Sequence, residues 1–145
     1  MRVTGPLVAN HVGLCVADLD RSIRFYVELL GFEVEREVVV GDGVAGPLLA
    51  VEAPVGLRAV YLRAGSFVLE LLHFDRLGNP PAVARVFNEP GLTHLSVCVD
   101  DPAQLAEQVE RFGGSVVTSL LPMALIIKDP DGQLLELLPM SYRQG

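Results

Sequence analysis

The chain contains an internal repeat, and this repeat constrains the fold more than any other feature of the sequence. The segment HVGLCVADLD, which begins at His11, resembles HLSVCVDDPA, which begins at His94. Four identical pairs lie at one common interval: His11 and His94, Cys15 and Cys98, Asp18 and Asp101, and Gly31 and Gly114. At a shorter interval, VLELL around Glu70 resembles LLELL around Glu136. The sequence therefore predicts two copies of one unit of about 60 residues.

Length and composition limit the class of protein. The 145 residues suffice for one compact domain with its own core, and 50% of them are hydrophobic, as in an ordinary globular protein. The net charge of −7 argues against a nucleic-acid partner. No apolar run approaches the ~18 residues of a membrane span, and the N-terminal segment lacks the apolar core of a signal peptide. With two cysteines and no CxxC motif, we expect a cytoplasmic protein with free thiols.

The first copy is predicted to fold in the order β-α-β-β-β. Apolar and polar residues alternate in Val8–Val16, as in a half-buried strand. Asp18 is a favoured helix N-cap, an apolar stripe follows it at helical spacing, and Gly31 is suited to end the helix. Further strands are predicted at Phe32–Val40, Leu57–Arg63 and Phe67–His73. The glycine- and proline-broken segment 41–56 is predicted to be a loop, whose apolar part Val44–Val55 suits a lid or a dimer contact.

The second copy repeats this order. A strand at Thr93–Val99 precedes a helix at Pro102–Phe112, which begins with a proline near its first position. The remaining strands are predicted at Ser115–Ser119, Met123–Lys128 and Leu134–Pro139. The two modules then span about 7–73 and 91–140, and the linker 74–90 joins them with room for a short helix. The predicted fold class is α+β, as a single domain of two tandem βαβββ modules.

The alternation of side chains along the strands places the candidate functional residues. His11 and His94 lie on the strand faces opposite the apolar residues that each helix must cover. Glu70 and Glu136 interrupt apolar strands, and a buried carboxylate needs a partner. We therefore predict that these four residues bind one divalent cation on a shared concave face, with Ni, Co, Zn, Mn or Fe all compatible. The predicted pocket wall consists of Cys15, Val68, Leu72, Ser96 and Cys98.

Four motifs together resemble the vicinal oxygen chelate superfamily. They are the His11 strand followed by DLDRSIRFYVELLGF, then FVLELL, GLTHLSVCVDD and DPDGQLLELLP. This superfamily includes glyoxalase I, methylmalonyl-CoA epimerase, extradiol dioxygenases, and bleomycin- and fosfomycin-resistance proteins. The resemblance implies paired modules that form a curved eight-stranded cup around a metal, with His11, Glu70, His94 and Glu136 as ligands. It also implies that modules pair within a chain or between chains, and we expect a homodimer.

Departures from the family patterns narrow the range of substrates that we expect. Bacterial glyoxalase I resembles this chain in its ligand quartet but typically uses an arginine and an asparagine on glutathione where this chain has Cys15 and Phe74. Glutathione recognition is therefore not indicated. Extradiol dioxygenases use two histidines and one glutamate, and Glu70 would fill a position that they leave open. The only spare histidine, His73, has the parity opposite to Glu70 and is predicted to face away from the cup.

The expected activity is metal-assisted proton transfer next to a carbonyl, as in a lyase, isomerase or epimerase. Glu136 or Glu70 would act as the base, because a bound cation narrows the pKa gap between a carbon acid and a carboxylate. The small and apolar walls suit a modest, fairly apolar substrate with two chelating oxygens. Two alternatives are a non-enzymatic antibiotic-binding protein and an extradiol dioxygenase. Metal analysis of the purified protein separates the first alternative from a metal-dependent enzyme.

Overall fold

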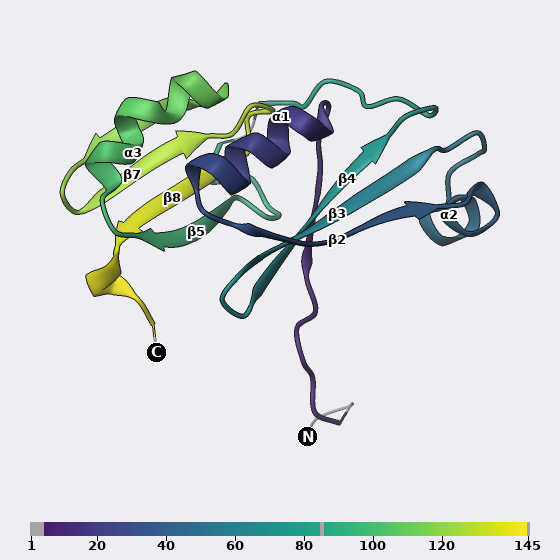
Figure 1. Ribbon diagram of the computed structural model, residues 1–145, viewed down its shortest axis with the longest axis horizontal. Coiled ribbons are helices and arrows are strands. Elements are labelled where there is room, and N and C mark those ends of the chain that lie inside the picture. Colours follow the sequence, from purple (N-terminus) through teal and green to yellow (C-terminus); the bar gives the residue numbers. More distant parts are fainter. Residues whose placement is uncertain (1–4, 85, 145) are drawn as a thin grey trace.

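The protein is described here by a computed structural model of residues 5–84 and 86–144, whose strands form two four-stranded sheets (Figure 1). The first sheet has the order β1 (Val12–Cys15), β4 (Phe67–Phe74), β3 (Leu57–Ala64), β2 (Glu33–Val40). The second has the order β5 (His94–Val99), β8 (Leu134–Pro139), β7 (Ala124–Lys128), β6 (Ser115–Leu120). The strand β1 runs parallel to β4, and β5 runs parallel to β8. The other pairings are antiparallel. The predicted α+β fold with two repeated modules is confirmed.

The helices begin where the repeated aspartates predicted. In the first module α1 (Leu19–Ile23) continues as the π-helical η1 (Arg24–Leu29); in the second, α3 (Pro102–Gln108) continues as the 3-10 helix η2 (Val109–Phe112). The Asp18 and Asp101 side chains each accept a hydrogen bond at 3.0 Å from the backbone N–H three residues later. These bonds satisfy otherwise unpaired donors of the first helical turn. A final 3-10 turn, η3 (Met140–Tyr142), follows β8. No helix among the described residues has the length and hydrophobicity needed to cross a membrane.

One sequence-based prediction of local structure is wrong. Segment 41–56 was predicted to be a loop because glycine and proline disfavour helices, yet it contains the helix α2 (Asp42–Leu49). The Asp42 carboxylate accepts hydrogen bonds from the Gly56 backbone N–H at 3.1 Å and from the Arg76 guanidinium at 2.8 Å. Ala45, Val55 and Leu57 also form a small separate core beneath it. These long-range contacts override the local propensity. The described residues of the linker contain turns and no helix.

A single core joins the two modules. It contains the fully buried Phe25 and Tyr26 of η1, Val109 of η2, and apolar residues from one face of each sheet. The helical segments η1 and η2 contact each other, and in Figure 1 α1 and α3 both lie in the upper half of the view. The helices therefore cover one face of each sheet, and the faces that carry the histidines lie on the other side.

A buried polar contact fixes one module against the other. The Tyr26 hydroxyl of η1 donates a hydrogen bond at 2.9 Å to Asp129, which lies in the turn between β7 and β8. Asp129 also accepts bonds from the backbone N–H groups of Asp131 and Gln133 at 2.9 and 2.8 Å. Burial raises the pKa of this carboxyl above its usual value. Arg21 donates to Asp131 at 2.8 Å beside it. These bonds set the relative orientation of the two modules.

The repeated glycines Gly31 and Gly114 are needed for different reasons. Gly31 has φ of +78° in open space, whereas a Cβ on Gly114 would lie 2.4 Å from the Lys128 carbonyl oxygen and 2.7 Å from the Phe25 ring. We therefore expect Gly114→Ala to lower the free energy of unfolding by at least about 1–3 kcal/mol, because neither neighbour can move freely. Chemical denaturation measures this change.

The matched variant is Gly43→Ala in the short helix α2, where an added Cβ meets nothing within 4 Å. Its unfolding free energy is expected to stay the same or rise by up to ~1 kcal/mol, since alanine is the better helix former. Equal stabilities for Gly114→Ala and the wild type would contradict the close packing at Gly114.

Candidate functional site

The first module brings His11 and Glu70 together. His11 directly precedes β1, and Glu70 lies on β4, where it is in register with Gly13. Nε2 of His11 lies 3.1 Å from Oε2 of Glu70. On the other side of the ring, Nδ1 donates a hydrogen bond to Oδ1 of Asn10. A donor at Nδ1 leaves the Nε2 lone pair free in the neutral ring, which is the form that binds metals. His11 and Glu70 are called the first half-site.

Two further side chains adjoin this half-site, and sequence reasoning missed both. Tyr61 of β3 is in register with Glu70, and the interaction of its hydroxyl with the Glu70 carboxylate, together with partial burial, raises the pKa of Tyr61. The His11 and Tyr61 rings meet edge to face, with 5.5 Å between their centroids. The guanidinium carbon of Arg36 lies 4.1 Å from the centroid of the Tyr61 ring. The positively charged Arg36 thus contacts Tyr61, which in turn is in register with Glu70.

The second module brings His94 and Glu136 together in the same way. Nε2 of His94 lies 3.8 Å from Oε2 of Glu136, and Ser96 Oγ donates a hydrogen bond to the same carboxylate oxygen at 2.7 Å. Nδ1 of His94 forms a hydrogen bond with Thr93 Oγ1 at 2.8 Å, and the Phe87 ring lies 5.4 Å away. His94 and Glu136 are called the second half-site.

The two half-sites do not meet within one chain. Among the residues that the structure describes, no group of three or more His, Cys, Asp or Glu side chains is placed to hold a metal ion. Each predicted His–Glu pair is therefore assembled by its own module, while the complete quartet stays a prediction. The relative orientation of the modules separates the pairs, because each half-site lies on a sheet face turned away from the shared core.

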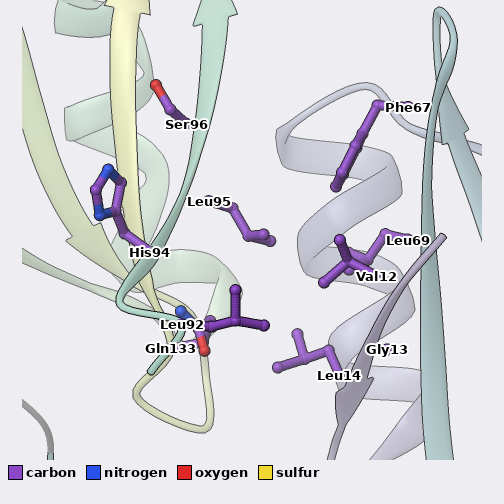
Figure 2. A pocket seen from close by; sticks show the side chains of 10 residues that line it. All are labelled: Val12, Gly13, Leu14, Phe67, Leu69, Leu92, His94, Leu95, Ser96 and Gln133. Atoms are coloured by element: carbon purple, nitrogen blue, oxygen red, sulfur yellow. The ribbon is translucent and has the colours of Figure 1, made fainter. Parts of the chain in front are cut away.

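A cavity of about 270 Å³ between the modules is not the meeting point of the half-sites. Figure 2 shows Leu92 and Leu95 of the second module facing Val12 and Leu14 of the first across this space. His94 and Ser96 contribute to its rim, but their side chains lie on the far side of β5 and point away from the first module (Figure 2). The cavity is therefore an apolar seam.

The predicted wall residues divide between the half-sites. Cys15 pairs with Leu72 in the sheet register beside Glu70, and Val68 lines a shallow cavity with Tyr61. Ser96 and Cys98 lie on β5 and line a larger cavity of about 600 Å³, together with Leu138, Met140, Tyr142 and Arg143. Both cysteines are free thiols. Burial, followed by the charge of Asp131, raises the pKa of Cys15, so this thiol stays protonated and is unsuited to be a nucleophile.

His73 takes part in neither half-site. Its Nδ1 donates a hydrogen bond to the Val16 carbonyl oxygen at 3.0 Å, and its Nε2 lies 3.2 Å from Asp75. In the sheet it is in register with Arg58 rather than with Tyr61. It therefore lies on the sheet face opposite Glu70, where its parity predicted it.

Each half-site has donors that suit a divalent cation. An imidazole nitrogen and a carboxylate oxygen are ligands for Zn, Ni, Co, Mn and Fe. Two ligands that are each ~2.1 Å from one ion lie about 3.0–3.4 Å apart. The nitrogen-to-oxygen distance of 3.1 Å in the first half-site lies within this range, and that of 3.8 Å in the second is longer. The residues present thus fit one half of a four-ligand centre in each module.

Comparison with known proteins identifies the family. The model of the Glyoxalase/Bleomycin resistance protein/Dioxygenase superfamily matches residues 8–137. A lactoylglutathione lyase of Neisseria meningitidis is 31% identical over 138 residues, which cover 87% of this chain and 86% of that protein. A Bacillus cereus glyoxalase-family protein matches with a TM-score of 0.79 at 21% identity, covering 96% of this chain and 97% of that one. The trypanothione-dependent glyoxalase I of Leishmania major matches with a TM-score of 0.66 at 26% identity, covering 90% and 85%. The resemblance seen in the sequence is confirmed, and this chain belongs to the Glyoxalase/Bleomycin resistance protein/Dioxygenase superfamily.

Proposed function

We propose that this protein is a metal-dependent enzyme that transfers a proton next to a carbonyl group of a small, oxygen-chelating substrate. The observation that carries this proposal is the repeat-equivalent pairing of Nε2 with Oε2 in both half-sites. Relatives that carry the name lactoylglutathione lyase support an enzyme of the lyase or isomerase type. Glutathione is not proposed as part of the substrate, because Cys15 and Phe74 stand where the glutathione-binding residues are expected.

The proposal includes a homodimer in which the first half-site of one chain faces the second half-site of another. Among the residues that the structure describes, β1 pairs with β4 alone and β5 with β8 alone, so each of these strands has one open edge. Open edges need a partner or a cover. A twofold axis that joined them would unite four-stranded sheets into eight-stranded cups and create two equal centres.

Exposed apolar side chains support such an assembly. Every residue of β6 is exposed, including Val116, Val117 and Leu120. Val44 and Leu48 of α2 are likewise exposed, at 61% and 73%. Apolar surface gathered on single elements is typical of a protein contact rather than of a solvated face. The predicted dimer contact of the Val44–Val55 segment therefore remains part of the proposal.

The surroundings of the two glutamates suggest different roles. Glu70 is only 12% exposed, lies 3.1 Å from Nε2 of His11 and is in register with Tyr61, which suits a fixed ligand. Glu136 is 30% exposed and accepts a hydrogen bond from Ser96, so it is freer to reach a substrate proton. We assign Glu136 as the base. A bound divalent cation supplies Lewis-acid stabilisation of the negative charge that develops beside the carbonyl.

The first test is metal uptake by the full chain. Protein stripped with a chelator and then dialysed separately against Ni, Co, Zn, Mn or Fe(II) is expected to retain about one ion per chain of at least one of them, since each chain supplies two half-sites. Elemental analysis gives the stoichiometry. A His73→Ala variant, which removes a histidine outside both half-sites, should take up the same amount. If no first-row metal is retained in stoichiometric amount, the enzyme proposal fails and the antibiotic-binding alternative is favoured.

A further inference from the structure

A β-bulge brings Arg36 to the face of the first half-site. The register between β2 and β3 shifts between Val34 and Arg36. Val34 pairs with Leu62, which is buried in the shared core, whereas Arg36 pairs with Tyr61. In a regular strand, residues two apart point to the same side, so Arg36 would share the side of Val34. The extra residue of the bulge reverses the alternation and directs Arg36 towards Tyr61 and Glu70 instead.

The contact with Tyr61 holds the guanidinium in place beside the first half-site. The guanidinium carbon lies over the Tyr61 ring, 4.1 Å from its centroid. A guanidinium carries five N–H donors in one plane, so a contact with Tyr61 leaves donors for a second partner. Arg36 and Tyr61 line a shallow cavity of about 280 Å³, whose other lining residues are Asn10, Val68 and the paired Glu35 and Arg63. The donors are therefore available beside a space next to the half-site.

Arg36 has no acidic partner in the described part of the chain. On the same two strands, Nε of Arg63 donates to Glu35 at 3.1 Å, which satisfies that arginine. No carboxylate oxygen of a described residue forms an ion pair with Arg36, although the sequence contains 18 acidic residues and only 11 lysines and arginines. An unpaired arginine in so acidic a protein is suited to an anion that comes from outside.

The second half-site lacks this cation although it keeps the bulge. The strand β6 has the same register shift, between Val116 and Thr118. The positions aligned across the sheets are Arg36, Tyr61 and Glu70 in the first module and Thr118, Ile126 and Glu136 in the second. A module therefore folds with its bulge without the arginine, and Arg36 is not required for the local structure. A ligand between facing half-sites would meet a cation on one side and an aliphatic side chain on the other.

We propose that Arg36, stacked on Tyr61 beside the first half-site, binds a carboxylate group of the substrate. This inference rests on the proposed function and specifies its substrate class as a small monocarboxylate with a carbonyl oxygen. The guanidinium fork matches a planar carboxylate, and one arginine neutralises one negative charge. The apolar remainder of such a substrate suits the Ile126 side of the centre. Arg36 thus provides a binding group for the substrate carboxylate. The chain has Cys15 and Phe74 at the positions where glutathione-binding residues are expected.

The test compares pyruvate with pyruvamide, which has the same skeleton but no charge. Both are titrated calorimetrically into the full-length, metal-loaded protein, and metal content is measured in each sample. Wild-type protein is expected to bind pyruvate about tenfold or more tightly than pyruvamide, as for a charge-assisted hydrogen bond. Arg36→Met should remove this preference by weakening pyruvate alone. Arg36→Lys should retain part of it, since lysine keeps the charge without the planar fork.

The matched variant is Arg58→Met, which removes the same charge from the opposite face of the same sheet, where Arg58 is in register with Val39 and His73. It should leave both affinities unchanged. Equal weakening of both probes by Arg36→Met, or an equal effect of Arg58→Met, would overturn the inference. Tighter, Arg36-dependent binding of inorganic phosphate than of pyruvate would overturn the carboxylate assignment.

The two proposals fail separately. Stoichiometric metal uptake without any preference for pyruvate overturns only the role of Arg36. An Arg36-dependent preference for pyruvate in protein that retains no metal supports the carboxylate site and contradicts the metal-dependent enzyme.

Discussion

Replacing His94 with alanine is expected to abolish metal uptake and proton transfer together, whereas Glu136→Gln should abolish only the proton transfer. The alanine removes an imidazole nitrogen that points at Glu136 from 3.8 Å, and a centre with one ligand fewer loses most of its affinity. Glutamine can still ligate through its amide oxygen but cannot accept the substrate proton. We expect Glu136→Gln to slow the exchange by roughly 10²–10⁴-fold, the usual contribution of a general base. The rate is that of solvent-deuterium uptake at the methyl group of pyruvate, followed by NMR alongside elemental analysis.

Glu70→Gln is the informative comparison for this base assignment. Glu70 is the less exposed carboxylate and lies closer to its histidine, at 3.1 Å against 3.8 Å, so its substitution should weaken metal binding more than Glu136→Gln does. Exchange at the wild-type rate in Glu136→Gln, with loss of exchange in metal-loaded Glu70→Gln, would reverse the two roles.

The half-sites could be predicted from the sequence because they depend on local patterns. Strand alternation places His11 and Glu70 on the same face, and parallel pairing of β1 with β4 then puts Glu70 in register with Gly13, two residues from His11. The repeated aspartates cap their helices because an N-cap needs only residues within one turn. Each of these features depends on neighbours along one strand or one helical turn.

Arg36 and α2 could not be predicted in the same way. Alternation counts residues along a strand, and the bulge at Glu35 adds one residue without a clear signal in the sequence. In α2, the burial of Ala45 and the hydrogen bonds that Asp42 accepts from Gly56 and Arg76 outweigh the low helix propensity of glycine and proline. In both places the deciding contacts are with other strands or loops.

The separation of the half-sites has a similar cause at a larger scale. Parity indicates the face on which each pair lies but not how two sheets are turned against each other. That angle depends on the shared core and on the bond between Tyr26 and Asp129, which are far apart in the sequence. Bonds of this kind hold the pairs on separate faces of one chain, and a second chain then becomes the natural source of the missing ligands.

Mixing two inactive variants is expected to restore metal binding if the centre is built across chains. A His11→Ala chain carries a defect in its first half-site, and a Glu136→Ala chain carries one in its second. In a mixed dimer, one centre combines both defects while the other is made wholly of native ligands. With random pairing half of the dimers are mixed, so an equimolar mixture should regain about a quarter of the wild-type metal uptake. Each variant alone should bind almost none.

The matched mixture combines His11→Ala with Glu70→Ala, whose defects both lie in the first half-site. Every centre of that mixed dimer then contains one defect, so no recovery is expected, although the number of substitutions is the same. Recovery in the first mixture and not in the second can arise only from centres shared between chains, because a centre within one chain gives no recovery in either. Equal recovery in both mixtures, or a strictly monomeric wild type in sedimentation at micromolar concentration, would contradict the two-chain centre. The open edges of β1 and β5 make recovery in the first mixture alone the expected result, since pairing these edges satisfies the backbone groups of the same strands that carry or adjoin the two half-sites.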